Sequence, residues 1–247
     1  MSIKFSGRIV SLVPSLTELL IDLGLGEQIV GRTRFCILPE DKVGDIPIIG
    51  GTKNPNLDKI KALKPDMIVA NYEENRKEDI AQLQSGFRVF LTDIRSISDA
   101  FQSIRDIGNL FGVSTQTQDL IRQIEQLFEE RPTLKPIPTL YLIWRDPWMG
   151  VGRDTYVNDV MQHWELSNVL HSDDRYPVID PENRTFDRPE LILLSSEPFP
   201  FKTKHSVELR SNFADAHIEF VDGKWFSWYG SRMLPSFRAL NDWRKQV

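Results

Sequence analysis

The sequence lacks most of the residues and motifs on which catalysis and cofactor binding commonly depend. Cys36 is the one cysteine in 247 residues, which excludes an intramolecular disulfide and any metal site built from several thiolates. The motifs of phosphate-binding loops, dinucleotide-binding folds, zinc proteases and serine hydrolases are missing. The four histidines are scattered along the chain. We therefore expect no catalytic residues, no metal site and no intrinsic cofactor.

The sequence also lacks an excess of positive charge and a long apolar run. The formal net charge is -5 at pH 7 and no run of Lys and Arg follows the pattern of phosphate-binding segments, so nucleic-acid binding is not expected. No apolar run reaches the roughly 18 residues of a membrane-spanning helix. Residues 1–15 lack the apolar core of a secretory signal. We expect a soluble chain, which either works in the cytoplasm or has had an export signal or lipid anchor removed before this chain was made.

Short apolar strands alternate with helices in both halves of the sequence. This alternation predicts the α/β class, with parallel sheets covered on both faces. Ser15 and Glu18 form a capping-box pattern at the first helix. Strands are expected at 8–13, 29–33, 67–70, 88–91, 139–144, 191–194 and 217–221. Helices are expected at 16–23, 56–63, 76–84, 98–111, 156–164, 207–211 and 231–245.

Residues 114–131 have the spacing of one long amphipathic helix. Its apolar side chains recur every three or four positions, Ser114 can cap its first turn, and Pro132 cannot continue it. A helix of this length spans roughly 25 Å. We interpret it as a strut between two domains, with a surface helix of one continuous domain as the alternative. The predicted organisation is an N-terminal α/β lobe at 1–97, helices at 98–135 and a C-terminal α/β lobe at 136–247.

Aromatic and cationic side chains gather in the loops after predicted strands, where open α/β sheets bind ligands. The stretches that follow the strands at 139–144 and 217–221 hold four of the six tryptophans, counting Trp144 at the end of its strand. Indole rings suit a bulky, flat or amphipathic ligand in a cleft between the two halves, although part of these aromatics could instead plug the ends of the sheet. The predicted ligand-binding residues are Arg34, Tyr72, Trp144, Arg145, Trp148, Trp225, Phe226, Trp228, Tyr229 and Arg232.

Four stretches together resemble the helical-backbone substrate-binding proteins of ABC importers. They are residues 8–18 (RIVSLVPSLTE), residues 57–69 (LDKIKALKPDMIV), the helix at 114–131, and residues 225–232 (WFSWYGSR). The cobalamin-binding branch is the most similar, with ferric-siderophore and haem binders as neighbours. The resemblance covers nearly the whole chain. It implies two Rossmann-like lobes with parallel sheets, joined by a single long helix, with the ligand cleft between the lobes.

The same resemblance implies a membrane partner. In the family, a glutamate on each lobe docks on arginines of the ABC permease. Glu73 or Glu74 in the first half and Glu197 in the second lie in loops that match this role, with a solvated surface acid as the alternative for each. The family is periplasmic or membrane-anchored, whereas this chain shows no export signal, so a cytoplasmic corrinoid carrier is a further alternative.

The leading hypothesis is a monomeric, non-enzymatic protein that captures a cobalamin-like corrinoid in an aromatic cleft and delivers it to an ABC permease. A ferric-siderophore or haem binder is the alternative of the same class, and for a ferric siderophore arginines should matter more than tryptophans. An enzyme acting on a corrinoid or nucleotide in the same cleft is an alternative of another class. An interaction module with an empty cleft is the third.

Overall fold

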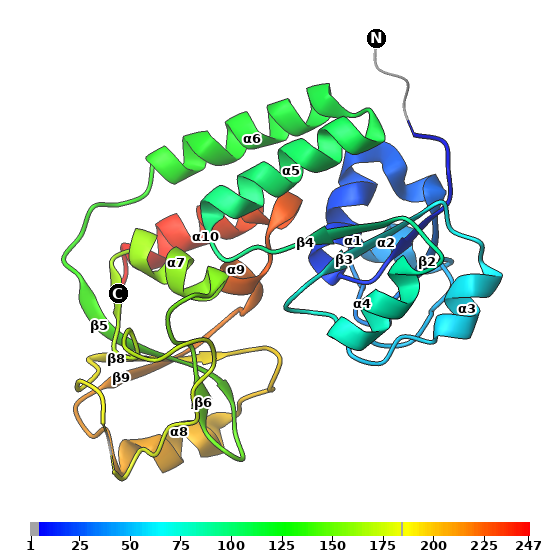
Figure 1. The fold of residues 1–247 in the computed structure, drawn as a ribbon. Helices are drawn as coiled ribbons and strands as arrows, with labels where there is room; N and C mark the ends of the chain where they lie inside the picture. The colour runs from blue at the N-terminus through cyan, green and yellow to red at the C-terminus, as the bar shows by residue number, and fades with distance from the viewer. Residues whose placement is uncertain (1–4, 184) are drawn as a thin grey trace. The chain divides into compact units, whose positions relative to one another are not determined.

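The computed structural model describes residues 5–183 and 185–247 (Figure 1). The chain divides into two compact units. Unit 1 runs up to Ile94 and includes Ser98–Gln123 and Tyr229–Arg232, and unit 2 contains Arg95–Ile97, Ile124–Trp228 and Met233–Val247. The division therefore falls within the long helix rather than at the proline-rich stretch 132–139. Close to its end the chain returns to unit 1 for one short segment.

Unit 1 contains, within the described residues, a four-stranded parallel sheet. The strands are β1 (Ile9–Ser11), β2 (Ile29–Arg32), β3 (Met67–Asn71) and β4 (Val89–Thr92), in the order β2-β1-β3-β4. Its helical elements are α1 (Pro14–Leu20), η1 (Ile21–Leu25), η2 (Gly26–Gln28), α2 (Glu40–Val43), α3 (Leu57–Ala62), α4 (Lys77–Gln84), η3 (Gly230–Arg232) and most of α5 (Ile97–Phe111). Helix α6 (Ser114–Glu129) begins in unit 1 and ends in unit 2.

Helices cover both faces of the unit 1 sheet, because side chains along each buried strand alternate between the faces. Val10 and Ile68 point to the face on which α3 and α4 lie, where they pack with Ile60 and Ile80. Figure 1 shows α1 on the opposite side of this sheet, and every residue of α1 after its first is buried. The carboxyl ends of the four parallel strands consequently share one open edge.

Helices α5 and α6 lie side by side (Figure 1). Gly112 ends α5 with φ of 68°, a left-handed conformation that glycine adopts without strain. Gly108 of α5 faces Thr117 of α6 so closely that a Cβ atom would lie 2.2 Å from Thr117 Oγ1. The helix predicted at 114–131 is therefore present and packs tightly against the helix before it.

Unit 2 contains a second sheet, with the strand order β6-β5-β8-β9 and with β7 pairing on β5. Most pairs are parallel, and the short β6 is antiparallel to β5. The strands are β5 (Ile137–Trp144), β6 (Met149–Gly150), β7 (Leu166–Asn168), β8 (Leu191–Ser195) and β9 (His217–Val221). The helices are α7 (Tyr156–His163), α8 (Thr203–Arg210), α9 (Lys224–Ser227) and α10 (Met233–Arg244).

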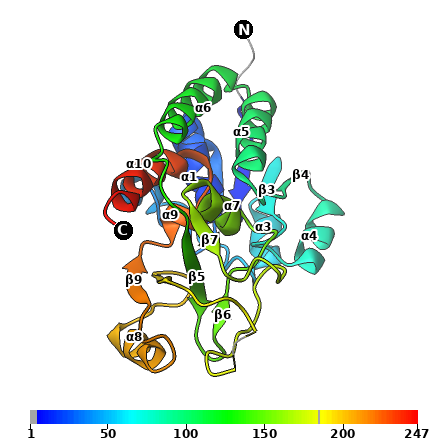
Figure 2. The same ribbon diagram turned by 90° about the vertical axis from the view of Figure 1, so that its left-hand side faces the viewer.

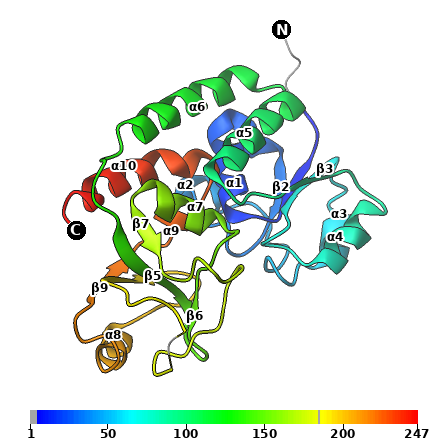
Figure 3. The same cartoon turned by 60° about the vertical axis from the view of Figure 1, so that its left-hand side comes forward.

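Different helices pack on the two faces of the unit 2 sheet. Helix α8 lies on one side, where Leu209 packs with Leu140 and Ile192 of the strands. Figures 2 and 3 show α7, α9 and α10 on the other side of the sheet. There Phe226 of α9 meets Tyr141 of β5 edge-on, with ring centroids 5.0 Å apart. In the part of the chain that the structure describes, no helix is both long and apolar enough to cross a membrane.

Two local predictions are wrong. The capping box at Ser15 and Glu18 does not form, because α1 begins directly after Val13 and has no side-chain cap, while the Glu18 carboxylate pairs with Arg232. The stretch after β9 is also not a simple loop. It contains α9, whose short turn directs alternate aromatic side chains inward, and this turn is too short to give a periodic signal.

Candidate functional site

The open edge of unit 1 carries exposed aromatic side chains. Phe35 follows β2 and is 53% exposed, and Tyr72 follows β3 and is 59% exposed. Arg34 is exposed as well, and its guanidinium carbon lies 6.0 Å from the centre of the Phe35 ring. Two large aromatic rings exposed at the strand ends, one of them beside a cation, make this edge a candidate contact surface.

The loop after β3, which holds the predicted docking acids, is fixed by buried asparagines. Asn71 Oδ1 accepts the backbone N–H groups of Glu73 and Glu74 at 2.8 and 3.2 Å. Asn75 Nδ2 donates to the carbonyl oxygen of Thr52 at 3.1 Å, which ties the loop to the neighbouring one. Glu73 and Glu74 are half-buried. The backbone that carries both carboxylates is thus held in one conformation.

The open edge of unit 2 carries a continuous group of rings, which we call the aromatic cluster: Trp144, Trp148, Phe199, Phe201 and His205. Trp144 ends β5 and is 39% exposed, and its ring centre lies 5.5 Å from that of Phe199. Phe199 lies 4.9 Å from Phe201, which stacks on Trp148 at 5.9 Å. Sequence reasoning missed Phe199, Phe201 and His205, although both phenylalanines follow β8 and the rule about strand ends would have found them.

The members of the cluster differ in what they can offer to a ligand. Trp148 is 6% exposed and belongs to the apolar core of unit 2, so its rings are already covered. His205 is buried, and its Nδ1 accepts the backbone N–H of Lys202 at 2.8 Å. Burial lowers the pKa of His205 from its ordinary value, which favours the neutral ring. Trp144 and Phe199 therefore form the accessible part of the cluster.

Arg145 lies next to the cluster but already has acidic partners. Its Nη2 and Nε atoms donate to the two carboxylate oxygens of Glu208 on α8 at 2.5 and 3.2 Å, and Nη1 donates to Asp146. The guanidinium also lies over the Trp148 ring, 4.8 Å from its centre. The charge of this arginine is balanced within unit 2.

The predicted aromatic stretch after β9 is mostly interior. Phe226 is fully buried, and Trp228 and Tyr229 are 8% and 7% exposed. Trp228 Nε1 donates a hydrogen bond to Glu197 Oε1 at 2.7 Å, so the polar atom of this indole already has a partner within the protein. Trp225 is half-buried and is the tryptophan of this stretch with most free surface.

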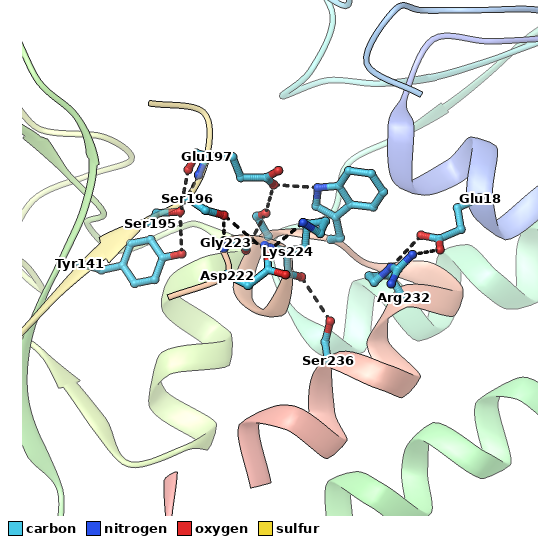
Figure 4. Close-up of polar contacts among 12 residues, drawn as sticks. Glu18, Tyr141, Ser195, Ser196, Glu197, Asp222, Gly223, Lys224, Arg232 and Ser236 are labelled. Carbon is cyan, nitrogen blue, oxygen red and sulfur yellow. Dashed lines mark hydrogen bonds and ion pairs between the residues drawn. The ribbon is translucent and has the colours of Figure 1, made fainter. Parts of the chain in front are cut away.

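Glu197 follows β8 and is held by several groups that Figure 4 shows converging on it. Its Oε1 also accepts the hydroxyl of Ser227 at 2.9 Å, and its backbone carbonyl accepts the hydroxyl of Ser195 at 2.6 Å. Gly223 packs against the same loop, where a Cβ atom would lie 2.6 Å from Glu197 Cγ. This carboxylate is thus positioned by unit 2 itself.

Arg232 forms an ion pair with Glu18, also drawn in Figure 4. Arg232 Nε donates to Glu18 Oε2 at 3.0 Å and Nη2 donates to Oε1. The side chains are 23% and 7% exposed. Gly230, at φ of 83°, places this segment against Leu19 of α1. The arginine predicted to bind ligand is therefore joined to a buried carboxylate of unit 1.

Comparison with known proteins decides the family. A family model described as "Periplasmic binding protein" matches residues 9–222. The chain belongs to the periplasmic binding protein family. It is a substrate-binding protein of the ABC transporter kind rather than an enzyme. The predicted fold class, with parallel sheets in two α/β lobes, is confirmed.

Named members of the periplasmic binding protein family differ in their ligands. The chain is 29% identical over 190 residues to an uncharacterized ABC transporter substrate-binding lipoprotein, YvrC, of Bacillus subtilis, a match that covers 67% of this chain and 54% of that protein. It is 24% identical over 229 residues to a vitamin B12-binding protein of Vibrio vulnificus, covering 89% of this chain and 83% of that protein.

A solved structure extends the similarity of this periplasmic binding protein to haem binders. The periplasmic heme-binding protein RhuT from Roseiflexus sp. RS-1 has a TM-score of 0.77 at 21% identity, and the match covers 97% of this chain and 100% of that one. Likeness at this identity concerns the fold. Within the described residues, no group of three or more His, Cys, Asp or Glu side chains is arranged to hold a metal ion.

Proposed function

We propose that this periplasmic binding protein captures a cobalamin-like corrinoid with partly exposed aromatic side chains at strand ends and delivers it to an ABC permease. The candidate contacts are Phe35 and Tyr72 in unit 1 and Trp144 and Phe199 in unit 2. These rings are the large, stiff and partly exposed surfaces at the strand ends where ligands of α/β sheets bind. Trp225, half-buried after β9, is a further candidate contact.

The single observation that carries the choice of ligand is the pairing of the arginines. Arg145 is bound to Glu208, and Arg232 to Glu18, so two of the three arginines proposed for the site have their charge balanced by a carboxylate. Haem, with two propionates, and catecholate ferric siderophores carry negative charge that must be matched, whereas cyanocobalamin has no net charge and offers amides and an apolar rim. Aromatic rings with few free cations favour the corrinoid.

Three acids are proposed for the permease. Glu73, Glu74 and Glu197 stand in loops at the strand ends, on backbones fixed by hydrogen bonds. Glu197 Oε1 is occupied by Trp228 and Ser227, which orients the other carboxylate oxygen, Oε2, away from these donors. An oriented carboxylate suits a fork-shaped guanidinium of a partner protein.

Calorimetric titration of the purified chain with cyanocobalamin, haem and a ferric siderophore tests the ligand proposal. We expect saturable binding of cyanocobalamin. Trp144→Ala should weaken it about tenfold or more, because roughly 100 Å² of exposed indole would be lost at about 25 cal/mol per Å². Trp243→Phe, far along α10, is the matched control and should leave the affinity unchanged. Binding of haem or siderophore in place of cyanocobalamin would refute the corrinoid proposal.

A further inference from the structure

The guanidinium of Arg145 is positioned to contact both the aromatic cluster and α8. Arg145 follows β5 directly after Trp144, lies over the Trp148 ring, and donates two hydrogen bonds to the carboxylate of Glu208. The hydrogen bond from Arg145 is the main cause that holds the pKa of Glu208 below its ordinary value, and Trp148 also donates to this carboxylate. Glu208 is therefore ionised at neutral pH and balances the arginine.

Without the carboxylate of Glu208, this edge of unit 2 would be more positively charged. His205 is held in a hydrogen bond that requires a neutral Nδ1. The remaining nearby cations are Lys202 and Lys204 at the start of α8, both exposed and surrounded by water. Arg145 is the cation that lies over the Trp148 ring. Without Glu208 its guanidinium would keep, among the described residues, only Asp146, an acid exposed to solvent, as an acidic partner and would attract an anionic ligand more strongly.

We infer that Glu208 is a specificity-determining residue, which cancels the charge of Arg145 so that the aromatic cluster accepts an uncharged corrinoid and disfavours anionic tetrapyrroles. The inference rests on the proposed function. Glu208 acts through Arg145, so it is a positioning residue and does not itself contact the ligand. Specificity of this kind arises as much from removing attraction to the wrong ligand as from contacts with the right one.

The test compares two flat macrocycles of different charge. Wild type and Glu208→Gln are titrated with cyanocobalamin, which has no net charge, and with haem, which carries two propionates. Glutamine keeps the size and a hydrogen-bond acceptor but not the charge. We expect the ratio of haem affinity to cyanocobalamin affinity to rise about tenfold, the usual size of one close charge contact. The effect should shrink when salt is raised.

Two variants separate the role of Arg145 from that of net charge. Glu190→Gln removes the same charge at the amino end of β8, where it is exposed, and should leave the ratio within about twofold of wild type. Arg145→Gln/Glu208→Gln removes both partners and should return the ratio to the wild-type value. Thermal unfolding of each variant verifies that the chain is folded.

The outcomes distinguish the inference from the function on which it rests. A wild-type chain that binds neither macrocycle overturns the proposed function. A chain that binds cyanocobalamin, but whose preference is the same in Glu208→Gln and wild type, overturns the inference alone. An equal shift in Glu190→Gln would also overturn it, because the effect would then come from net charge.

Discussion

Replacing Glu18 by Gln is expected to destabilise the protein strongly, although it removes only a charge. Glu18 is 7% exposed, and both of its carboxylate oxygens accept hydrogen bonds from Arg232. The substitution removes the carboxylate charge that faces the Arg232 guanidinium in a largely buried position. Removing one partner of a fully buried pair costs about 3–5 kcal/mol.

The exposure of Arg232 sets the expected size of the loss. Its side chain is 23% exposed, so water can solvate part of the guanidinium charge, and we expect the variant to lose about 2–3 kcal/mol of unfolding free energy. For a chain of this size that corresponds to a lowering of Tm of about 4–12 °C. Thermal unfolding followed by circular dichroism measures it.

Two further variants make the reasoning refutable. Asp22→Asn lies one helical turn further along, is exposed, and should change the unfolding free energy by no more than about 0.5 kcal/mol. The double variant Glu18→Gln/Arg232→Gln leaves no unmatched charge and should lose less than the sum of the two single variants. Additive losses, or a Glu18→Gln variant as stable as Asp22→Asn, would show that the ion pair does not hold segment 229–232.

Three other substitutions probe the network around Glu197 and the aromatic cluster. Gly223→Ala should cost about 1–3 kcal/mol, because its Cβ atom would lie 2.6 Å from Glu197 Cγ, whereas Gly44→Ala, with open space around it, should cost little. Trp228→Phe removes the N–H that donates to Glu197 and should lower the unfolding free energy by about 1–3 kcal/mol, while corrinoid affinity stays within about twofold of wild type. A large loss of affinity would show that Trp228 contacts the ligand. Folding lowers the pKa of His205, so the unfolded chain binds a proton at a higher pH than the folded chain does. The folded state therefore loses stability relative to the unfolded state as the pH falls below about 6.5. Tm should decline less steeply over that range in His205→Asn than in wild type, and an equal decline would contradict this.

The alternation of strands and helices was sufficient to predict most of the fold. Buried strands such as β3 and β8 are short, uniformly apolar runs, and α6 has a clear helical period, so local pattern and tertiary packing agree. The position of the division between units was not predictable in the same way. It depends on contacts between segments far apart in the sequence, such as the return of Tyr229–Arg232 to unit 1, which a local pattern does not show.

The sequence predicted candidate residues at the strand ends, but not which of their side chains are exposed. The rule that ligands bind at strand ends located Tyr72 and Trp144, which are exposed there. The sequence does not reveal whether an aromatic ring near that edge is accessible. Trp148 and Phe226 lie in equally aromatic stretches and are buried, because packing from α8 and α10 decides their environment.

The pairing of arginines with glutamates was the feature of the site that the sequence indicated least. Arg145 and Glu208 are 63 residues apart in sequence, and Arg232 and Glu18 are 214 apart. From the sequence alone, each of these four charged residues is expected to be exposed to solvent. Their pairing follows from the fold, and it shows that both arginines predicted to contact ligand have acidic partners within the protein.

The central claim is that these aromatic edges select a corrinoid, and competitive equilibrium dialysis tests it most directly. The purified chain is dialysed against an equimolar mixture of cyanocobalamin, haem and a ferric siderophore, and the retained pigment is identified by its absorption spectrum. We predict that cyanocobalamin is retained, at about one molecule per chain, and that Trp144→Ala retains much less. Retention of haem or siderophore, or of no pigment at all, would contradict the account.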